Sequence, residues 1–526
     1  MKGAEALIRT LVDRGVDTCF MNPGTSEMHF VAALDDVPDM HSVLALFEGV
    51  ATGAADGYAR VAGRPAVTLL HLGPGLGNGL ANLHNARRAR SPVLNIVGDH
   101  AISHRPYDAQ LQSDIETVAR NVSLAYVHTS ESAAGLAGDA VAALAAAIGP
   151  PATVATLIVP ADVSWTEGGS VAPVEGPQGG GPQPPAGATP DSAVVARAAD
   201  ALRSGERTAV MIGGRACAGL ALDVAADVAA STGAAFLCET FPARLERGVG
   251  RPSVNRLAYL AELAAMQLDG LRHLVLVDAA SPVSFFAYPG KRSDLVPDGC
   301  TVHHLVGPGD DVGAAVASLA ALLEVKSGGA KRAVAASPEM PTGPLTAQTV
   351  CQVLGVLLPE GAIVSDEGNT SGIFAPGATE GSPPHDWLCL TGGAIGQGLP
   401  VAVGAAVAAP NRRVVALESD GSALYTLQSW WTMARQGLDV TTVLLNNQSY
   451  AVLNMELDRV GVERPGPLAR RMLDLSDPSM DFVHLAKGLG LHATRAETAE
   501  EFSDQLARAL ATPGPSVVEA VVPPLL

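Results

Sequence analysis

Apolar and polar positions along the chain follow two periods in turn, and together they predict a repeating series of helices and strands. The first apolar stripe, within residues 7–12, has helical spacing and ends at Gly15, and residues 16–21 then predict a buried strand. Helical and strand patterns continue to alternate to about residue 165. This alternation is typical of α/β domains built on a parallel sheet.

Two stretches interrupt the pattern. Residues 166–190 are rich in Gly and Pro and poor in apolar side chains, and residues 326–344 form a second such segment. Strand patterns near 209–212 and 274–277 lie between them, and the last block ends with a helix capped by Thr498 and Glu501 and a strand at 516–522. We therefore expect three doubly wound parallel-sheet α/β domains, at residues 1–165, 191–325 and 345–526, with linkers at 166–190 and 326–344.

Composition narrows the class of protein. The chain has 526 residues, 48% of them hydrophobic, which is ample for three cores. Its net charge of −19 argues against a surface that binds nucleic acid. No stretch resembles a signal peptide or a membrane span, so we expect a soluble, cytoplasmic protein without a membrane partner. The six cysteines show no close pairing and predict neither a disulfide framework nor a zinc site.

Polar residues follow two neighbouring strand patterns in the last block. The strand at 414–417 leads into Asp420 and then a helix pattern whose apolar face includes Leu424 and Trp431, and the strand at 440–445 leads into Asn447. Because parallel strands end at the same edge of a sheet, Asp420 and Asn447 should meet there. Their oxygens suit Mg²⁺ completed by phosphate and water. The alternative is a helix N-cap at Asp420 and a plain turn at Asn447.

Glu48 is a second unusual residue. The apolar pattern on both sides of it predicts burial, and a buried carboxylate needs a partner, a proton or a function. The turn at residues 22–27 follows a strand and opens a helix. Its backbone donors and the hydroxyl of Thr25 could bind a substrate carboxylate, or the turn could be an ordinary N-cap.

These motifs resemble those of thiamine-diphosphate-dependent 2-oxo acid decarboxylases and carboligases, of the acetolactate synthase and benzoylformate decarboxylase type. The family motif is Gly-Asp-Gly followed after about 26 residues by Asn-Asn, and Ser419 replaces its first Gly here. The resemblance implies that Asp420, Asn447 and the carbonyl of Ser449 hold Mg²⁺. It also implies that Glu48, which opens the segment 48–60, protonates the aminopyrimidine ring and so makes the cofactor its own base.

The same resemblance assigns further cofactor and active-site residues. In the loop 391–396, Gly393 would accept the pyrimidine amino group and Ile395 would support the bent cofactor. The diphosphate would be held by four residues: Asn369, Thr370, Gly421 and Ser422. Two candidate catalytic residues follow from position, because His71 falls where benzoylformate decarboxylase has an active-site His and Gln112 where acetolactate synthases carry Gln. Asn454 and Glu456 fall in the substrate-pocket segment.

Two other interpretations stay open, a nicotinamide dehydrogenase and a non-catalytic paralogue. The glycines of 73–79 follow a strand and, with Asp99, resemble a nicotinamide-dinucleotide loop, although Pro74 removes a donor. FAD is unlikely, because the middle domain lacks the Met-His-Gly segment of flavin-binding acetolactate synthases. Benzoylformate decarboxylase has a second catalytic His in its middle domain. The corresponding residues here, 282–288, contain no His. A non-catalytic, cofactor-binding paralogue would account for Ser419 and for that missing His.

The resemblance spans the whole chain and implies a function. We expect decarboxylation of a small-molecule 2-oxo acid with thiamine diphosphate and Mg²⁺, followed by carboligation of the remaining fragment to a second carbonyl. Simple decarboxylation is the alternative. Because family members build each active site from two subunits, the resemblance also implies a homodimer or homotetramer.

Overall fold

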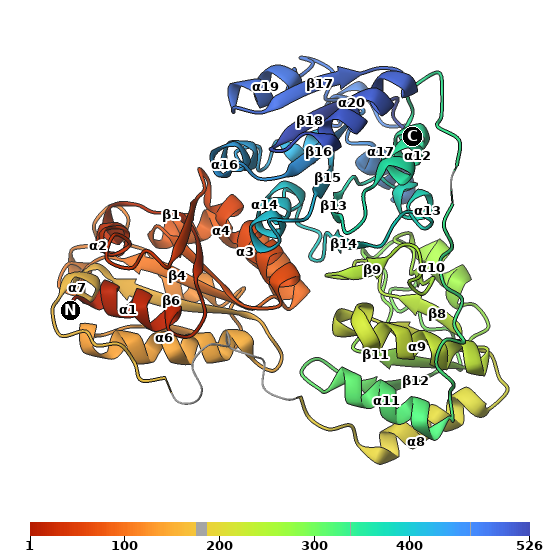
Figure 1. Ribbon diagram of the computed structural model, residues 1–526, viewed down its shortest axis with the longest axis horizontal. Helices are drawn as coiled ribbons and strands as arrows, with labels where there is room; N and C mark the ends of the chain where they lie inside the picture. Colours follow the sequence, from red (N-terminus) through yellow and green to blue (C-terminus); the bar gives the residue numbers. More distant parts are fainter. Residues whose placement is uncertain (175–186, 337, 463, 526) are drawn as a thin grey trace.

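The chain forms three sheets with flanking helices (Figure 1). This computed structural model describes residues 1–174, 187–336, 338–462 and 464–525. The strands of the first sheet lie between residues 18 and 160, those of the second between 208 and 306, and those of the third between 363 and 521, apart from β9. The α/β fold class predicted from the alternating pattern is confirmed. The domain boundaries predicted above remain a proposal that fits these strand positions.

The first sheet has the order β2-β1-β3-β4-β6-β5, and every pair in it is parallel. Its strands are β1 (Thr18–Asn22), β2 (His41–Leu44), β3 (Ala66–Leu70), β4 (Val93–Asp99), β5 (Val127–Thr129) and β6 (Val154–Pro160). Its helices are α1 (Gly3–Val12), α2 (Met28–Ala33), α3 (Glu48–Ala62), α4 (Leu72–Ala89), α5 (Ile115–Ala119), α6 (Ala133–Ile148) and α7 (Ala161–Trp165), with short 3₁₀ turns η1 (Thr25–Glu27) and η2 (Arg105–Tyr107).

The central sheet has the order β10-β8-β7-β11-β12 and is also parallel throughout. Its strands are β7 (Thr208–Ile212), β8 (Ala235–Cys238), β10 (Asn255–Arg256), β11 (His273–Val277) and β12 (Thr301–Val306). The flanking helices are α8 (Ser192–Arg203), α9 (Gly219–Thr232), α10 (Ala261–Leu268) and α11 (Val312–Leu322), with η3 (Gly214–Cys217) between β7 and α9.

The third sheet has the order β17-β18-β16-β15-β13-β14-β9. Its strands are β13 (Ile363–Glu367), β14 (His385–Cys389), β15 (Val414–Ser419), β16 (Val440–Asn446), β17 (His492–Ala496) and β18 (Ser516–Val521). The helices are α12 (Ala347–Leu357), α13 (Ala375–Ala378), α14 (Gly398–Ala408), α15 (Asp420–Ala423), α16 (Ser429–Gln436), α17 (Ala451–Arg459), α18 (Pro467–Arg471), α19 (Phe482–Gly488) and α20 (Ala499–Ala511). Strand β9 (Leu245–Arg247) comes from the central segment and pairs antiparallel with β14, so the two domains share this edge.

Neighbouring residues of each strand enter different hydrophobic cores, because side chains alternate between the two faces of a strand. In β15, Val415 and Leu417 join the core shared with the central domain, whereas Val414 and Ala416 join the core shared with the first domain. The cores therefore continue from one domain to the next.

Helices α3 and α14 lie side by side between the first and third sheets (Figure 1). Their backbones approach so closely that a Cβ on Gly57 would lie 2.2 Å from the Val401 carbonyl oxygen, and a Cβ on Gly404 would lie 1.8 Å from that of Ala54. Glycine is therefore required at both positions. This contact holds the segment that begins with Glu48 against the third domain.

Three sequence predictions need correction or restriction. The pattern after Asp420 is not one helix but two, α15 and α16, and the side chain buried completely is Trp430 rather than Trp431, while Leu424 is exposed. The chain turns between the helices, which changes the buried face. Part of the linker predicted at 166–190 lies outside the described residues. None of the helices in the described parts of the chain has the length and apolar character needed to span a membrane.

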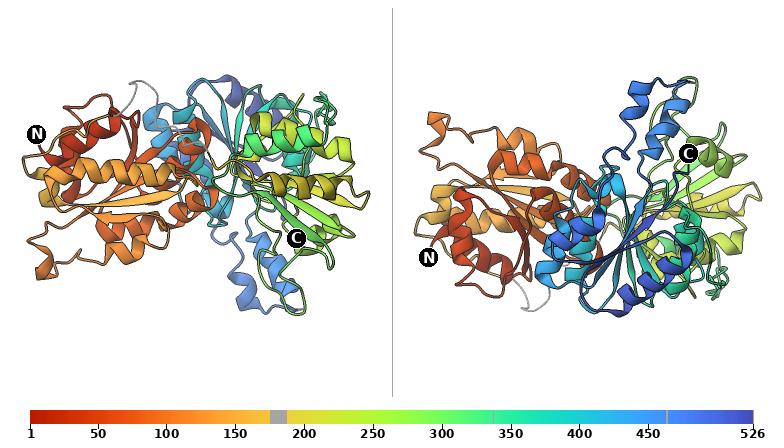
Figure 2. Two further views of the ribbon diagram at one scale, coloured as in Figure 1. Left: turned by 90° about the horizontal axis from the view of Figure 1, so that it is seen from below. Right: turned by 90° about the horizontal axis from the view of Figure 1, so that it is seen from above.

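The segment with α17 and α18 projects from the third domain, as the light blue helices in Figure 2 show. Only Ala451 is buried in α17 and no residue is buried in α18. Contacts with the central domain hold α17: Tyr288 donates to Glu456 at 2.7 Å, and the Arg459 guanidinium lies 3.9 Å from the centre of the Tyr288 ring. Glu456, predicted to lie in the substrate-pocket segment, thus already has partners.

Candidate functional site

The glycine-rich loop 391–396 lies against α4, whose polar residues bind its backbone. The carbonyl oxygen of Gly392 accepts from His84 at 3.1 Å, that of Ala394 from Asn85 at 2.7 Å and that of Gly396 from Asn82 at 3.1 Å. Helix α4 thus bonds the carbonyls of Gly392, Ala394 and Gly396, whereas those of Gly393 and Ile395 accept no hydrogen bond from it.

That arrangement fits the roles predicted for Gly393 and Ile395. Gly393 has φ +75°, and a Cβ there would lie 2.5 Å from Cζ of Phe285, so only glycine suits the position. Sequence reasoning missed the α4 residues, although a signal was present. Asn78, Asn82 and Asn85 have the i, i+4, i+7 spacing of one helix face.

The proposed metal ligands lie at the carboxyl edge of the third sheet. Strands β15 and β16 are parallel, with Ser419 opposite Leu445, and Oδ2 of Asp420 accepts the backbone N–H of Gln448 at 2.7 Å. The Asn447 amide accepts from the Ser449 N–H at 3.0 Å and donates to Ser371 at 3.1 Å. Asp420 and the turn that contains Asn447 are thus adjacent.

Electrostatics at this edge favour a cation. Burial raises the pKa of Asp420 to about 6, and hydrogen bonds from the backbone N–H groups of Gly421 and Gln448 oppose the rise. A divalent cation would offset the cost of burying that charge. No group of three His, Cys, Asp or Glu side chains in the described ranges is arranged as metal ligands, so this candidate rests on one carboxylate with amide and backbone oxygens.

Ser419 fits where the family motif has Gly. Its hydroxyl donates to the carbonyl oxygen of Glu367 at 3.2 Å and accepts from the Asn369 amide at 3.5 Å. The side chain therefore links the turn at Asp420 to the turn that follows β13, rather than crowding either one.

The four predicted diphosphate residues come from these same two turns. Asn369 has φ +45°, and Thr370 follows it in the turn after β13. A Cβ on Gly421 would lie 2.6 Å from the Tyr450 ring, so a side chain there would require that ring to move. The single proton of the Ser422 hydroxyl already has two acceptors within reach, Glu418 and the Ser419 carbonyl oxygen, so it is not free to donate to a phosphate in this arrangement.

Glu48 is the first residue of α3 and is 7% exposed. Its Oε2 accepts from the Asn78 amide at 3.0 Å, and a Cβ on Gly75 would lie 3.0 Å from Oε1. The predicted burial of Glu48 is confirmed. The Asn78 amide is the hydrogen-bond partner that a buried carboxyl needs.

His71 and Glu27 form a dyad that the sequence did not reveal. His71 Nδ1 lies 2.8 Å from Glu27 Oε2, which also accepts the N–H of Gly24 at 2.8 Å. Because a carboxylate accepts, Nδ1 carries the proton and Nε2 is left for other partners. Burial raises the pKa of Glu27, and the nearby His71 opposes the rise.

This dyad favours the second interpretation of residues 22–27, an ordinary helix cap, over an anion site. One of the turn's backbone donors, the Gly24 N–H, already binds the Glu27 carboxylate, so a substrate carboxylate would meet an existing negative charge. Thr25 is exposed at the start of η1, and a Cβ on Gly24 would overlap the His71 ring. The turn supports His71 directly.

Gln112 lies in the chain before α5, next to the His71 segment. Its neighbour Ser113 packs on Gly73, where a Cβ would lie only 1.9 Å from the Ser113 hydroxyl oxygen. The Gln112 Oε1 atom is buried and has no hydrogen-bond partner. A buried acceptor of this kind is available to a ligand.

Two alternative cofactor sites fit poorly. The glycines of 73–79, considered as a dinucleotide loop, lie within helix α4 and form no loop. In the central sheet, Arg90 from the first domain pairs with Asp278 at the end of β11, and Asp278 also accepts the Arg215 N–H at 2.8 Å. Asp278 therefore already has partners at the strand ends where doubly wound domains bind nucleotides.

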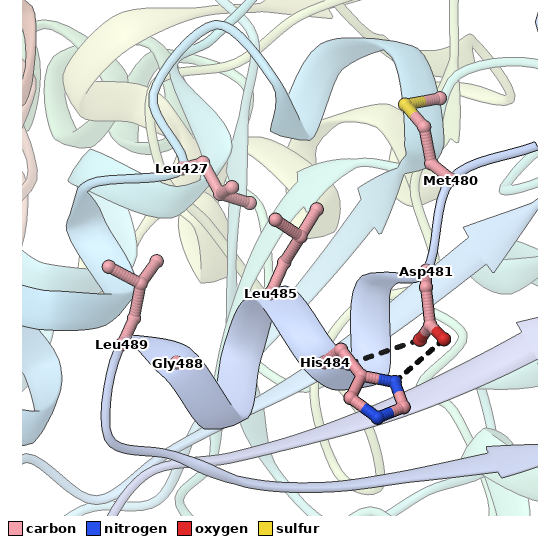
Figure 3. Close-up of a pocket in the computed structure, with 7 residues that line it drawn as sticks. All are labelled: Leu427, Met480, Asp481, His484, Leu485, Gly488 and Leu489. Carbon is pink, nitrogen blue, oxygen red and sulfur yellow. Dashed lines mark hydrogen bonds and ion pairs between the residues drawn. The ribbon is translucent and has the colours of Figure 1, made fainter. Parts of the chain in front are cut away.

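One open pocket of about 650 Å³ lies elsewhere, between α19 and the segment before α16 (Figure 3). Its lining is mostly apolar, and Asp481 caps α19 by accepting the N–H of His484 at 3.1 Å. None of the candidate site residues lines it. The pocket therefore adds nothing to the catalytic assignment.

The chain matches two protein-family models. Residues 1–121 match "Thiamine pyrophosphate enzyme, N-terminal TPP binding domain", and residues 366–520 match "Thiamine pyrophosphate enzyme, C-terminal TPP binding domain". These ranges contain every candidate site residue named above except those of the central segment.

Individual proteins agree with the family match. The chain is 58% identical, over 100% of both sequences, to "Putative acetolactate synthase large subunit IlvX" of Mycobacterium tuberculosis. It is 30% identical, over 96% of both, to benzoylformate decarboxylase of Pseudomonas aeruginosa. A solved Rhodococcus jostii structure, of a thiamine diphosphate-dependent 4-hydroxybenzoylformate decarboxylase, shares the fold with a TM-score of 0.80 at 23% identity, covering 99% of both chains. The chain belongs to the thiamine-pyrophosphate-dependent enzymes.

Proposed function

We propose that this protein decarboxylates a 2-oxo acid with thiamine diphosphate and Mg²⁺ and ligates the remaining fragment to a second carbonyl compound. The choice of ligation rests on Phe285. This residue lies in the segment that holds a second catalytic His in benzoylformate decarboxylases, and its ring contacts Gly393. A phenyl ring cannot donate the proton that would release an aldehyde.

The cofactor residues have separate tasks. Asp420, Asn447 and the carbonyl of Ser449 would hold Mg²⁺, while Gly393 and Ile395 would fix the pyrimidine ring. Bound thiamine diphosphate would supply the electron sink that allows a 2-oxo acid to lose CO₂. Glu48 would exchange a proton with the pyrimidine ring, and Asn78 keeps its carboxyl group in place.

His71 is the candidate for proton transfer near the substrate. The Glu27 carboxylate keeps the proton on Nδ1, so Nε2 has a free lone pair and would accept a proton at the reacting centre. Gln112 has a buried free acceptor and would bind a donor group of a reactant. No acid or base comes from Phe285, which supports ligation over release.

The test is a product analysis. The protein is incubated with thiamine diphosphate, Mg²⁺ and pyruvate, benzoylformate or glyoxylate, with and without an added aldehyde, and CO₂ and products are measured. We expect a 2-hydroxy ketone or 2-hydroxy acid as the main product. Free aldehyde as the main product would support simple decarboxylation instead.

A substitution makes this test more specific. Phe285→His places an imidazole beside Gly393 and should shift products from ligation towards aldehyde at similar CO₂ release. Phe286→Ala is the control, because Phe286 is a neighbouring ring of the same aromatic cluster, with its centroid 5.0 Å from that of Phe285. An unchanged product ratio in Phe285→His would contradict the role given to Phe285.

The proposal extends to the oligomeric state and the cellular location of the protein. We infer a homodimer or homotetramer in which two subunits build each active site, acting in the cytoplasm on small molecules. Large apolar side chains exposed on the single chain, including Ile373 and Tyr425 in the third domain, support such an association.

A further inference from the structure

Glu367 is a buried carboxylate that no step of the proposed mechanism uses. It is the last residue of β13 and is 2% exposed. Its Oε1 accepts the N–H of Gly396 at 2.8 Å, and its Oε2 accepts the N–H of Gly398 at 2.6 Å. No Lys, Arg or His among the residues that the structure describes forms an ion pair with it, so its main partners are the backbone N–H groups of Gly396, in the glycine-rich loop, and of Gly398, at the start of α14.

Gly398 packs so closely against Glu367 that a side chain would not fit between them. A Cβ on Gly398 would lie 2.8 Å from Cβ of Glu367 and 2.5 Å from Oε2 of Glu418, a second buried carboxyl group. Burial raises the pKa of Glu367 to about 7, and the N–H groups of the loop oppose that rise because they stabilise the charged form. Gly398 is therefore required for the close approach of β13 to this loop.

The same residue also contacts the metal side of the site. The carbonyl oxygen of Glu367 accepts the hydroxyl of Ser419, which immediately precedes Asp420. Asn369, two residues after Glu367, donates to that same hydroxyl oxygen. Glu367 thus lies where the glycine-rich loop, the metal turn and the predicted diphosphate turn meet.

We propose that Glu367 is a positioning residue for the cofactor, which fixes the loop so that Gly393 and Ile395 face the pyrimidine ring. Helix α4 binds three carbonyls of the loop from one side, through Asn82, His84 and Asn85, and Glu367 binds the N–H groups at its end. Without the carboxylate, two buried N–H groups would lack an acceptor, and the loop would move to satisfy them. This role rests on the proposed cofactor site but not on the identity of the substrate.

The test measures binding of thiamine diphosphate to full-length, Mg²⁺-loaded apo-protein by calorimetry, well below the melting temperature. In Glu367→Gln the amide nitrogen faces one of the two N–H groups, so the dissociation constant should rise tenfold or more. The circular dichroism of the bound aminopyrimidine ring should also change. A residue needed only for folding would lower the melting temperature and leave both signals unchanged.

Ser365→Ala is the matched control. Ser365 is buried on the same strand and donates to the carbonyl oxygen of Gly398 at 2.8 Å, without contact to the Gly396 or Gly398 N–H. Its removal should change the dissociation constant less than threefold. Equal weakening in Ser365→Ala and Glu367→Gln would overturn the proposal, as would Glu367→Gln binding within threefold of wild type.

A second variant covers the case in which Glu367→Gln does not fold. Glu367→Asp keeps a carboxyl group on a side chain one methylene shorter, which moves it away from the Gly396 and Gly398 N–H groups, so weaker binding supports the proposal and unchanged binding overturns it. If the variants weaken binding while wild type releases no CO₂ from any acid, the positioning role stands and the proposed reaction fails. If wild type itself does not bind thiamine diphosphate, both fail.

Discussion

A buried ion pair links the pyrimidine side of the molecule to the glycine-rich loop. Arg60 and Asp56 of α3 pair through two hydrogen bonds, and their side chains are at most 1% exposed. Arg60 also donates to the Cys389 carbonyl oxygen at 2.8 Å and to the Thr391 hydroxyl at 2.9 Å. Asp56 accepts one further bond, from Ser91.

Removal of Arg60 would leave the Asp56 carboxylate buried with only Ser91 as a partner. Loss of one partner of a buried ion pair costs about 3–5 kcal/mol. For a cooperative unit of 150–250 residues this corresponds to a fall of roughly 6–20 °C in the melting temperature. Because Thr391 begins the loop, Arg60→Ala should also weaken thiamine diphosphate binding several-fold.

Scanning calorimetry of Arg60→Ala, Asp56→Ala and the double variant measures the coupling. The double variant should be more stable than the sum of the single losses predicts, since no charge is left unpaired. Arg64→Ala is the control: Arg64 pairs with Asp17 on the surface, where such a pair contributes at most about 1 kcal/mol. Strictly additive losses, or a fall in Arg60→Ala no larger than in Arg64→Ala, would refute the reasoning.

Four further predictions follow from single residues. Glu48→Gln should lower kcat by about 10²–10⁴ in steady-state assays, with the calorimetric affinity for thiamine diphosphate within threefold of wild type; unchanged turnover would contradict the acid role. Asp420→Asn should raise the Mg²⁺ concentration for half-maximal activity at least tenfold, because the only carboxylate of the site is lost; an unchanged Mg²⁺ titration would place the metal elsewhere. Gly393→Ala should weaken thiamine diphosphate binding at least tenfold in calorimetry, because its Cβ meets Phe285 and its φ is positive; wild-type affinity would show that the loop tolerates a side chain. Burial lowers the pKa of His385 to about 4, so the unfolded chain takes up a proton before the native state does as the pH falls below 6.5. The free energy of unfolding should therefore fall by about 2 kcal/mol by pH 5.0. Urea titrations should show a smaller loss in His385→Asn, which keeps a donor for the Pro383 carbonyl; an equal loss would exclude His385 as the cause.

The sequence by itself determined the fold class and the main chemical groups. Strand and helix periods differ, and Gly and Pro mark the breaks between them, so three α/β domains could be predicted from local patterns. The turn at Asp420 and the turn at Asn447 could be paired in advance, because parallel strands end at one edge of a sheet. The burial of Glu48 also followed from its apolar neighbours.

Tertiary structure alone decided which distant residues meet. His71 and Glu27 are 44 positions apart, and nothing in either local pattern announces their pairing. Asn82 and Asn85 bind a loop more than 300 positions away, and Phe285 reaches Gly393 from another domain. The structure also divided the helix expected after Asp420 in two, since packing of Trp430 outweighs the apolar stripe that includes Trp431. Local periodicity records only whether a side chain is buried, whereas its partner depends on how helices and sheets pack across the whole chain.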